Sequence, residues 1–552
     1  MNKILLGFFI LTIVAGSLYF LFNIGQKETQ EYIAEDKSEE RIETIEEGIP
    51  LIEVSKEDIE NKSETTRLSV IPEGYTVLEV KFSPDGKHVA YIASNDDKKV
   101  VIYDDQKSNE YDEIERLIFS NNSKRLAYVA YKECKKLYLG TCEPIVVLDG
   151  GESEEYSKVT RMSFSPDSSH FAYIARLGDK ESEPGKGFST LSCREECKSI
   201  VVFDNEGSKQ YDTPYGNGVS EIIFSPDSKH FAYVAREADK QFVVFNGIKG
   251  KEYEEVDWLT FSSNSEHFTY VAREGKRDKS ESFSVFNDIE SERYGSVQNP
   301  IISKDSNRLA YIINRSSIII DGKLGKEYEY VHIEGDEGYY FNVPSPIFSN
   351  DSKKIAYGAK DSGGYFIVIN DEEGKRYDLV SDLKFSPDSQ HYVYIAKEDG
   401  DEFIVYDNSE GEKHDSYSLL KGSIKREEII FSPDSSHFAY VMIGDCKTVG
   451  TRPDMREICK NFIFYDDHKI EENGYVRSIV FSPDSKHFAY IKENTETEGH
   501  HVVMDSNEGK VYDSIYGKIS FTPDSNNIGY GALLGDELWW IVDSVDKFTD
   551  KE

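Results

Sequence analysis

The sequence contains few of the features that mark catalytic or nucleic-acid-binding proteins. Its 552 residues include only 3 Trp and 6 Cys, and 64 basic residues stand against 102 acidic ones, a formal net charge of −38 at pH 7. It has no run rich in Lys and Arg, so a surface that binds a phosphate backbone is not expected. The motifs GxSxG, GxxxxGK[ST] and HExxH are also absent, and they are the usual signs of a nucleophile elbow, a phosphate loop and a zinc protease.

Aromatic residues are plentiful, and they are mostly Tyr (36) and Phe (31). Such a bias favours strands over helices. Because hydrophobic residues make up 38% of the chain, it is not a disordered protein. No DxDxDG loop is present, so a calcium loop is not expected either. We therefore expect a folded, strand-rich protein with no cofactor, no metal site and no catalytic activity.

The N-terminus predicts a membrane anchor in residues 1–25. The 19 residues from Ile4 to Phe22 carry no charge, and a helix of that length spans about 28 Å. Lys3 precedes the segment and acidic residues follow it, which predicts a single-pass protein with its body outside the cytoplasm, in the periplasm or at the cell surface. A cleaved signal peptide is the alternative. The apolar run continues beyond the candidate cleavage site at Val14-Ala15-Gly16 and favours the uncleaved anchor.

Residues 26–67 are rich in acidic residues and poor in aromatic ones. This composition predicts a solvated spacer. A flexible chain of about 40 residues has an end-to-end distance of roughly 35 Å, so the spacer would hold the folded body away from the membrane.

An internal repeat dominates the rest of the chain. Its pattern is FSPDSKHFAYVA, as in residues 224–235, with substitutions in other copies. Eleven copies start at Phe82, Phe119, Phe164, Phe224, Phe261, Ile302, Phe348, Phe385, Phe431, Phe481 and Phe521. Each is followed by an apolar segment, a turn and a Tyr, as in VVFNGIKGKEYEEV at 243–256. The unit therefore predicts four short strands, a to d, in about 37 residues.

The turn between strands a and b has the expected chemistry, because Pro226 occupies the second turn position, where its fixed φ belongs. Strand b alternates Phe231 and Tyr233 with Ala232 and Val234, so it is apolar on both faces. A strand buried on both faces belongs to a sheet stacked between two others. Radially stacked four-stranded sheets form a β-propeller, an all-β fold.

The FSPDGKxxAY pattern resembles the TolB-type, WD-like propeller repeat, which also occurs in the propellers of dipeptidyl-peptidase-like enzymes. The resemblance covers roughly residues 70–545 and implies a propeller fold. It does not imply a particular function. TolB itself begins with a small α/β domain, whereas this chain begins with an apolar segment and an acidic spacer, so the role of TolB is not carried over.

Eleven units exceed the four to eight blades that are usual in one propeller. We expect two packed propellers, residues 68–340 and 341–552, with the boundary at the long connection 330–347. One large ring is the alternative. The last repeat ends after ELWWIVDSV without a fourth strand, and 68–78 resembles a fourth strand. Their pairing would close a ring and remove two exposed edges.

The six cysteines form three pairs that are close in sequence, and each pair lies between strands b and c of a long repeat: Cys134 and Cys142, Cys193 and Cys197, Cys446 and Cys459. An even, locally paired set outside the cytoplasm predicts disulfides. Zinc binding and free thiols are the alternatives. In a propeller the b–c and d–a connections share one rim, so these loops lie on one face. Long loops often carry binding function, and we expect a protein or peptide to bind there, especially near 176–199. Neutral insertions are the alternative.

The repeated histidines and the three tryptophans are two further candidates for a functional role. Seven His share one repeat position with Arg, Lys and Asn, which predicts a solvated polar position: His88, His170, His230, His267, His391, His437 and His487. The alternative is a ring of imidazoles that responds to pH. Trp258, Trp539 and Trp540 are expected in blade interfaces. The sequence thus predicts a protein- or peptide-binding scaffold that is not an enzyme. The alternatives are a glycan or cell-wall binder, or an enzyme with carboxylates in the propeller channel.

Overall fold

A computed structural model describes residues 65–549, apart from 133, 135–141, 178–197, 213–217, 276–279, 332–342, 416–422, 450–455, 467 and 495–498. The expected anchor (1–25) and nearly all of the spacer (26–67) lie outside these residues. Within the described part of the chain, no helix has the length and apolarity needed to cross a membrane. The described chain forms eleven antiparallel sheets, each built around four consecutive strand positions.

The first strands of the blades follow the d–a connections. They are β2 (Thr76–Phe82), β6 (Glu113–Phe119), β10 (Lys158–Phe164), β15 (Val219–Phe224), β19 (Glu255–Phe261), β23 (Val297–Ile302), β27 (Tyr330–Val331) with β28 (Ile347–Phe348), β32 (Leu379–Phe385), β37 (Ser423–Phe431), β41 (Tyr475–Phe481) and β45 (Ser514–Phe521).

The second strands contain the FAYVA segments. They are β3 (Val89–Asn95), β7 (Leu126–Lys132), β11 (Phe171–Leu177), β16 (Phe231–Glu237), β20 (Phe268–Glu274), β24 (Leu309–Ile313), β29 (Ile355–Asp361), β33 (Tyr392–Glu398), β38 (Phe438–Val449), β42 (Phe488–Asn494) and β46 (Asn527–Leu534).

The third strands pair with the second ones. They are β4 (Lys98–Tyr103), β8 (Glu143–Leu148), β12 (Lys198–Phe203), β17 (Lys240–Phe245), β21 (Glu281–Phe286), β25 (Ser317–Ile320), β30 (Gly364–Ile369), β34 (Asp401–Tyr406), β39 (Arg456–Tyr465), β43 (Gly499–Met504) and β47 (Glu537–Ser544).

The fourth strands are mostly short. They are β5 (Gln106–Lys107), β9 (Gly151–Glu152), β13 (Glu206–Gly207), β18 (Ile248–Lys249), β22 (Ile289–Glu290), β26 (Lys323–Leu324), β31 (Glu372–Glu373), β35 (Ser409–Glu410), β40 (His468–Glu472), β44 (Asn507–Glu508) and β1 (Thr66–Val70). Two further short strands, β14 (Tyr211–Asp212) and β36 (His414–Asp415), pair with β12 and β34. The helix α3 (Asp546–Thr549) follows β47.

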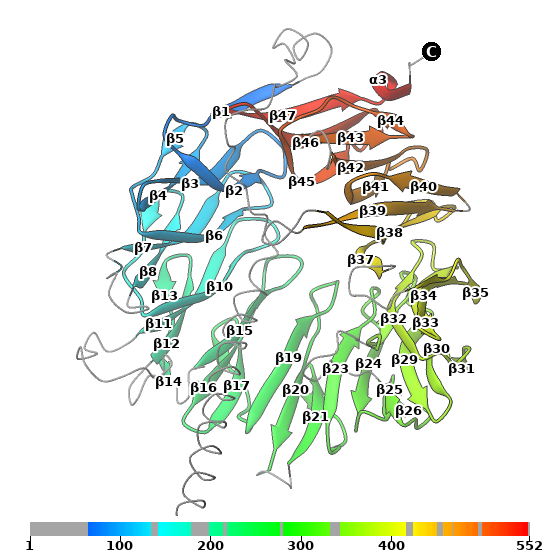
Figure 1. Cartoon of the computed structure of the whole chain (residues 1–552). Coiled ribbons are helices and arrows are strands. Elements are labelled where there is room, and N and C mark those ends of the chain that lie inside the picture. Colours follow the sequence, from blue (N-terminus) through cyan, green and yellow to red (C-terminus); the bar gives the residue numbers. More distant parts are fainter. Residues whose placement is uncertain are drawn as a thin grey trace, which may run out of the picture.

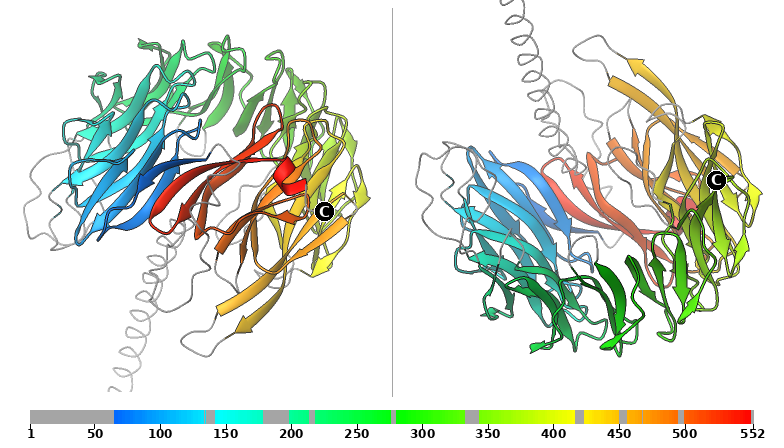
Figure 2. Two further views of the ribbon diagram at one scale, coloured as in Figure 1. Left: turned by 90° about the horizontal axis from the view of Figure 1, so that it is seen from above. Right: turned by 90° about the horizontal axis from the view of Figure 1, so that it is seen from below.

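The blades form one ring. Figure 1 shows them in sequence order around a common centre, and Figure 2 shows the first blade beside the last. Strand β1 pairs with β47 in the register Thr66↔Trp540 to Val70↔Glu537, so the N-terminal strand completes the eleventh blade. The expected closure of the ring is therefore confirmed. We number the blades 1 to 11, from β2–β5 to β45–β47 with β1.

The expected division into two packed propellers is wrong. One core cluster joins Ala310 and Ile312 of blade 6 to Tyr357 and Ala359 of blade 7, across the expected boundary. The connection 330–347 interrupts only the innermost strand of blade 7, which is split into β27 and β28. The second and third strands of blades 6 and 7 are continuous and supply most of this cluster, together with Val331 of β27, so the ring continues through this joint.

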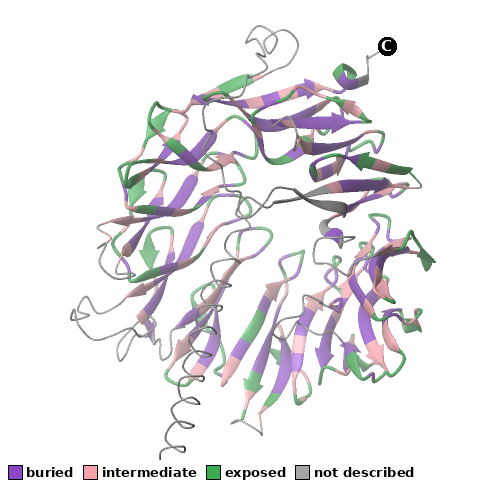
Figure 3. Cartoon of the chain, viewed as in Figure 1, coloured by how far each residue is buried: buried purple, intermediate pink, exposed green. Residues whose placement is uncertain are grey.

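Hydrophobic burial follows the repeat. The second and third strands are mostly buried, whereas exposed residues gather at the fourth strands and the turns (Figure 3). The two faces of β16 enter different cores: Ala232 and Val234 pack toward blade 5, and Tyr233 and Ala235 pack toward blade 3. No blade covers its own faces, as the sequence predicted.

Hydrogen bonds between the a–b turns add a second connection. In ten joints the backbone amide of a turn Asp or Asn donates to a buried Ser hydroxyl of the next blade, at 2.9–3.1 Å. Each of these serines has a left-handed backbone, with φ of 61–66°. They are Ser123, Ser168, Ser228, Ser265, Ser306, Ser352, Ser389, Ser435, Ser485 and Ser525.

The closing joint between blades 11 and 1 is built differently. There the turn position holds Gly86, with φ +69°, and a Cβ on it would lie 2.0 Å from the indole of Trp540. Trp540 also packs against Phe82, with ring centroids 5.8 Å apart. The indole thus occupies the space that the serine side chain takes elsewhere, and the ring closes on aromatic packing at this joint.

We expect Gly86→Ser, which restores the repeat pattern, to destabilise the protein. The added Cβ collides with Trp540, and overpacking of this kind costs about 1–3 kcal/mol. Urea unfolding followed by far-UV circular dichroism measures the change. In a Trp540→Ala background the same serine should cost much less, because its obstacle is gone. Equal costs in both backgrounds would contradict this account of the joint.

The turn aspartates predict acid sensitivity. The Ser225 hydroxyl and the Lys229 amide lower the pKa of Asp227 to about 2, against about 3.9 in an unfolded chain. The pKa values of Asp305, Asp351 and Asp484 are also lowered to about 2, in each case with a turn hydroxyl as the first cause. A lowered folded-state pKa gives stability that is present above pH 4 and is lost as the pH falls through 2.

We therefore expect the variant with Asn at all four positions to lose less stability than the parent between pH 4 and pH 2. Asn264 occupies the equivalent position in blade 5 and makes the same hydrogen bond through its backbone, so the substitution fits the turn. Urea midpoints measured at intervals from pH 5 to pH 2 test this expectation. Parallel curves for parent and variant would show that other carboxylates govern acid unfolding.

Candidate binding site

The ring presents three surfaces to a ligand. The b–c and d–a connections form one rim, here called the loop rim, and the a–b and c–d turns form the opposite turn rim. First strands of neighbouring blades contact each other, as β2 does with β45 and β6, so the first strands make an inner wall (Figure 1).

One expected cysteine pair is placed on the loop rim. Cys134 and Cys142 follow β7 and precede β8, with an S–S distance of 2.13 Å. The Cys134 amide donates to Oδ2 of Asp112 at 2.6 Å, so the base of this loop is fixed to the same blade rim. Cys193 and Cys197 lie outside the described residues.

The third pair falls on long strands rather than in a loop. Cys446 lies on β38 and Cys459 on β39. The ladder pairs Gly444 with Lys460 and Lys447 with Ile458, and its register shifts between these pairs. The backbone therefore places the two cysteines on facing segments of one hairpin, while their side chains lie outside the description.

The loop rim also carries a hollow of about 550 Å³ at blades 7 and 8. Acidic Glu329, Asp361 and Asp378 line it together with Lys360 and Tyr365. Arg376 contacts Asp361 at 2.8 Å and lowers the pKa of that carboxyl. The hollow is thus a charged surface in which some of the acids are already neutralised by this chain.

The histidine position on the turn rim is a hydrogen-bonded site, which the expectation of a merely solvated position missed. Nδ1 of five His lies 2.5–2.7 Å from Oδ2 of an Asp in the c–d turn of the same blade. The partners are Asp104, Asp204, Asp407, Asp466 and Asp505. His230 and His267 pair with Asn246 and Asn287 instead. The repeated Asp or Asn after strand c was visible in the sequence and is the signal for this pair.

The inner wall is made irregular by β-bulges. A register shift interrupts the pairing of nearly every described first strand, and seven residues at these shifts have left-handed backbones. They are Arg116, Arg161, Trp258, Asn299, Asp382, Ser478 and Gly517. The bulge recurs from blade to blade, whereas the type of residue that occupies it differs.

Polar side chains bridge the bulges of adjacent blades. Both oxygens of Glu428 accept from the amides of Ser478 and Ile479 at 2.7 and 3.0 Å. Oε2 of Glu221 accepts from the Leu259 amide at 3.1 Å, and Lys425 donates to the Val476 carbonyl at 2.6 Å. Much of the charge on the inner wall is therefore used to join one blade to the next.

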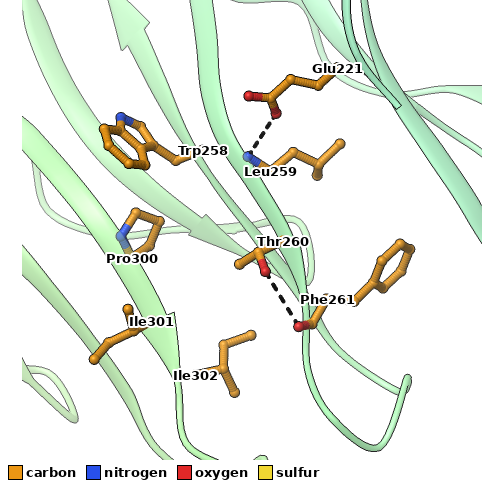
Figure 4. Close-up of a pocket in the computed structure, with 8 residues that line it drawn as sticks. All are labelled: Glu221, Trp258, Leu259, Thr260, Phe261, Pro300, Ile301 and Ile302. Atoms are coloured by element: carbon orange, nitrogen blue, oxygen red, sulfur yellow. Dashed lines mark hydrogen bonds between the residues drawn. The ribbon is translucent and has the colours of Figure 1, made fainter. Parts of the chain in front are cut away.

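Blades 4 to 6 of the wall enclose a hollow of about 360 Å³ (Figure 4). It is lined by Glu221 from β15, Trp258 to Phe261 from β19, and Pro300 to Ile302 from β23. Trp258 is 38% exposed, which corrects the expectation that it lies in a blade interface. Trp539 is buried in the core between blades 10 and 11, and Trp540 packs against blade 1, so for these two the expectation is confirmed.

The carboxylates of the wall include one pair that the sequence did not reveal. Burial raises the pKa of Glu221, and the nearby Asp257 carboxylate raises it further, whereas the Leu259 amide and Arg161 oppose this. No His takes part in this set. Among the described residues, no group of three or more His, Cys, Asp or Glu has the arrangement of a metal site.

One comparison with known protein families supports the repeat. A family model for the WD domain, G-beta repeat, matches residues 67–104. No curated protein matches the chain.

Solved structures share only low identity with the chain. One titled as a eukaryotic initiation factor is 11% identical, with 81% of this chain and 90% of that chain covered and a TM-score of 0.35. The tricorn protease is 10% identical, with 86% of this chain and 57% of that chain covered and a TM-score of 0.27. The match therefore spans little more than half of that protein. Hydrazine synthase of Kuenenia stuttgartiensis is 9% identical, with 59% of this chain and 96% of that chain covered and a TM-score of 0.25.

We expect all three cysteine pairs to be disulfides in protein taken from its native compartment. Peptide mass mapping without reduction should recover Cys134 with Cys142, Cys193 with Cys197 and Cys446 with Cys459. Alkylation before denaturation serves as the control against exchange. Free thiols at these positions would contradict both the pairing and the oxidising location.

Together, the repeat match and the eleven four-stranded blades identify the fold as a WD-like β-propeller.

Proposed function

We propose that this protein is a membrane-anchored, extracytoplasmic scaffold that binds another protein or a peptide on its loop rim. The observation that carries this proposal is the disulfide-closed Cys134–Cys142 loop on the same rim as the acidic hollow at blades 7 and 8. A fixed loop loses little conformational freedom on association. A rigid ring that presents such loops is suited to recognition, and we infer that its repeats are of the TolB type.

The proposed location rests on the sequence and on cysteine chemistry. The charge-free segment from Ile4 to Phe22 has the length of a membrane span, and Lys3 before it favours a cytoplasmic N-terminus. Disulfides persist in oxidising compartments, which agrees with a body outside the cytoplasm. The acidic spacer would then separate the ring from the membrane surface.

We further propose that the ring acts without catalysis. Glu221 and Asp257 are the strongest candidates for a catalytic pair, since both are outside the repeat and their pKa values are raised, first of all by burial. However, Glu221 already accepts the Leu259 amide as part of the wall. A glycan binder is the second candidate, because exposed aromatic side chains stack on sugars and Trp258 is exposed.

The proposal predicts that charge reversal on the loop rim weakens partner capture. Full-length tagged protein in detergent is incubated with extract from its own envelope, and the partner captured by the parent is identified and then titrated. We expect Glu329→Lys with Asp378→Lys to weaken its affinity at least about fivefold, since opposite charges steer and fix such complexes.

The matched control places the same substitutions on the turn rim, at Glu266 and Glu372, which are both exposed. Thermal unfolding verifies that both double variants are folded. Equal loss in both variants, or no loss in either, would contradict the loop rim as the binding surface. Turnover of a captured glycan or peptide would contradict the proposed lack of catalysis.

A further inference from the structure

Three exposed aromatic side chains belong to the first strands of blades 5, 7 and 10. Trp258, Tyr330 and Tyr475 are 38–44% exposed, and all three belong to first strands. The two tyrosines already hold a cation of this chain. Nζ of Lys360 lies 5.4 Å from the ring centroid of Tyr330, and Nζ of Lys425 lies 3.3 Å from that of Tyr475. Within the described residues, no Lys or Arg lies over the ring of Trp258.

The backbone of Trp258 has the left-handed conformation of the recurrent bulge. Its φ is +61°, and the register of β19 with β20 shifts between Asp257 and Thr260. A left-handed backbone costs a non-glycine residue about 1–2 kcal/mol, and the same conformation recurs at the bulges of six other described first strands. Trp258 is the one aromatic among the seven described wall residues with this conformation. The bulge turns its ring out of the wall instead of into the core.

The hollow beside Trp258 combines apolar walls with one carboxylate. Pro300, Ile301 and Ile302 form one side, and Glu221 lies at the end near Trp258 (Figure 4). Oε2 of Glu221 is used by the Leu259 amide. The figure shows its other oxygen on the side of Trp258. An apolar shaft and a cationic end would therefore both find a matching surface in this space.

We propose that this hollow, here called the Trp258 pocket, binds a lysine or arginine side chain of a basic peptide segment. The aliphatic part of the side chain packs against Pro300 and Ile301, and its cation lies between the face of Trp258 and the carboxylate of Glu221. Cation–π contact with Trp is the strongest of its kind. The net charge of −38 attracts basic segments toward the ring. The pocket is on the inner wall, so this proposal does not depend on the proposed binding of a partner at the loop rim.

Tryptophan fluorescence tests this proposal in the full-length protein. Only Trp258, Trp539 and Trp540 contribute, and Trp258→Phe supplies the blank for the other two. The probe is a short Gly–Lys repeat peptide. We expect a saturable change that disappears in Trp258→Phe, with a dissociation constant, measured by calorimetry, that rises about 2- to 30-fold in Trp258→Ala.

Three comparisons keep the test specific. Glu221→Gln should weaken binding at least about threefold, whereas Glu79→Gln removes the same charge from the wall of a distant blade and should have little effect. The same peptide with acetylated lysines should bind weakly, because it keeps the shaft and lacks the cation. Circular dichroism and thermal unfolding confirm that each variant is folded.

Several results would overturn the proposal. Equal effects of Glu221→Gln and Glu79→Gln would show general attraction by the acidic ring. Equal binding of acetylated and unmodified peptide would show an apolar site. A Trp258-dependent response to a neutral oligosaccharide such as chitohexaose, without a response to the lysine peptide, would assign the pocket to a glycan.

Discussion

Every blade of this ring has a second strand that is apolar on both faces, and no blade has material of its own to cover them. Ala232 and Val234 pack toward one neighbour while Tyr233 and Ala235 pack toward the other. Burial of such side chains contributes about 1.5–3 kcal/mol for each large one. Each uncovered apolar face therefore favours the packing of a further blade, until the ring closes. The pairing of β1 with β47 ends this series by removing the last free edges.

The turn serines fix the relative position of neighbouring blades and add little to the free energy of unfolding. A neutral hydrogen bond contributes about 0.5–1.5 kcal/mol, and the left-handed backbone that presents the hydroxyl costs about 1–2 kcal/mol. The two effects nearly offset each other. The hydroxyls are buried and accept the amide of the neighbouring turn at 2.9–3.1 Å, so they fix how far one blade slides against the next. This explains how the ten joints with a turn serine keep one geometry.

The repeat made the fold predictable because each copy independently carries the same strand pattern, turn and double-faced core. Ring closure was also predictable, since the repeat region ends in a third strand and is preceded by a segment that resembles a fourth. The number of rings was not, because Ile302 and the connection 330–347 change only the innermost strand of a joint, while the second and third strands on both sides keep their core residues. An irregular sequence there looked like a boundary although the cluster of Ala310 and Tyr357 crosses it.

The candidate pocket was harder to predict for the opposite reason. Trp258 and Glu221 occupy a position whose residue type differs among the copies, so the shared pattern does not identify them. Trp258 follows Asp257 in a sequence that reads as a regular strand, and alternation places its ring in a blade interface. The bulge between Asp257 and Thr260 reverses that orientation, and bulges leave no reliable pattern in a single sequence. The partner carboxylate comes from another blade, 37 positions earlier in the chain.

The departures from the repeat have a common logic. A ring of identical blades has no unique site, because every surface position recurs around the axis. Gly86 breaks the series to admit Trp540 at the closing joint, and the disulfide-bonded insertion after β7 breaks it on the loop rim. The tryptophan at the recurrent bulge, Trp258, breaks it on the inner wall. The regular strands supply enough burial to tolerate strain and insertion at such positions, and a specific ligand can be recognised only where the repetition is interrupted.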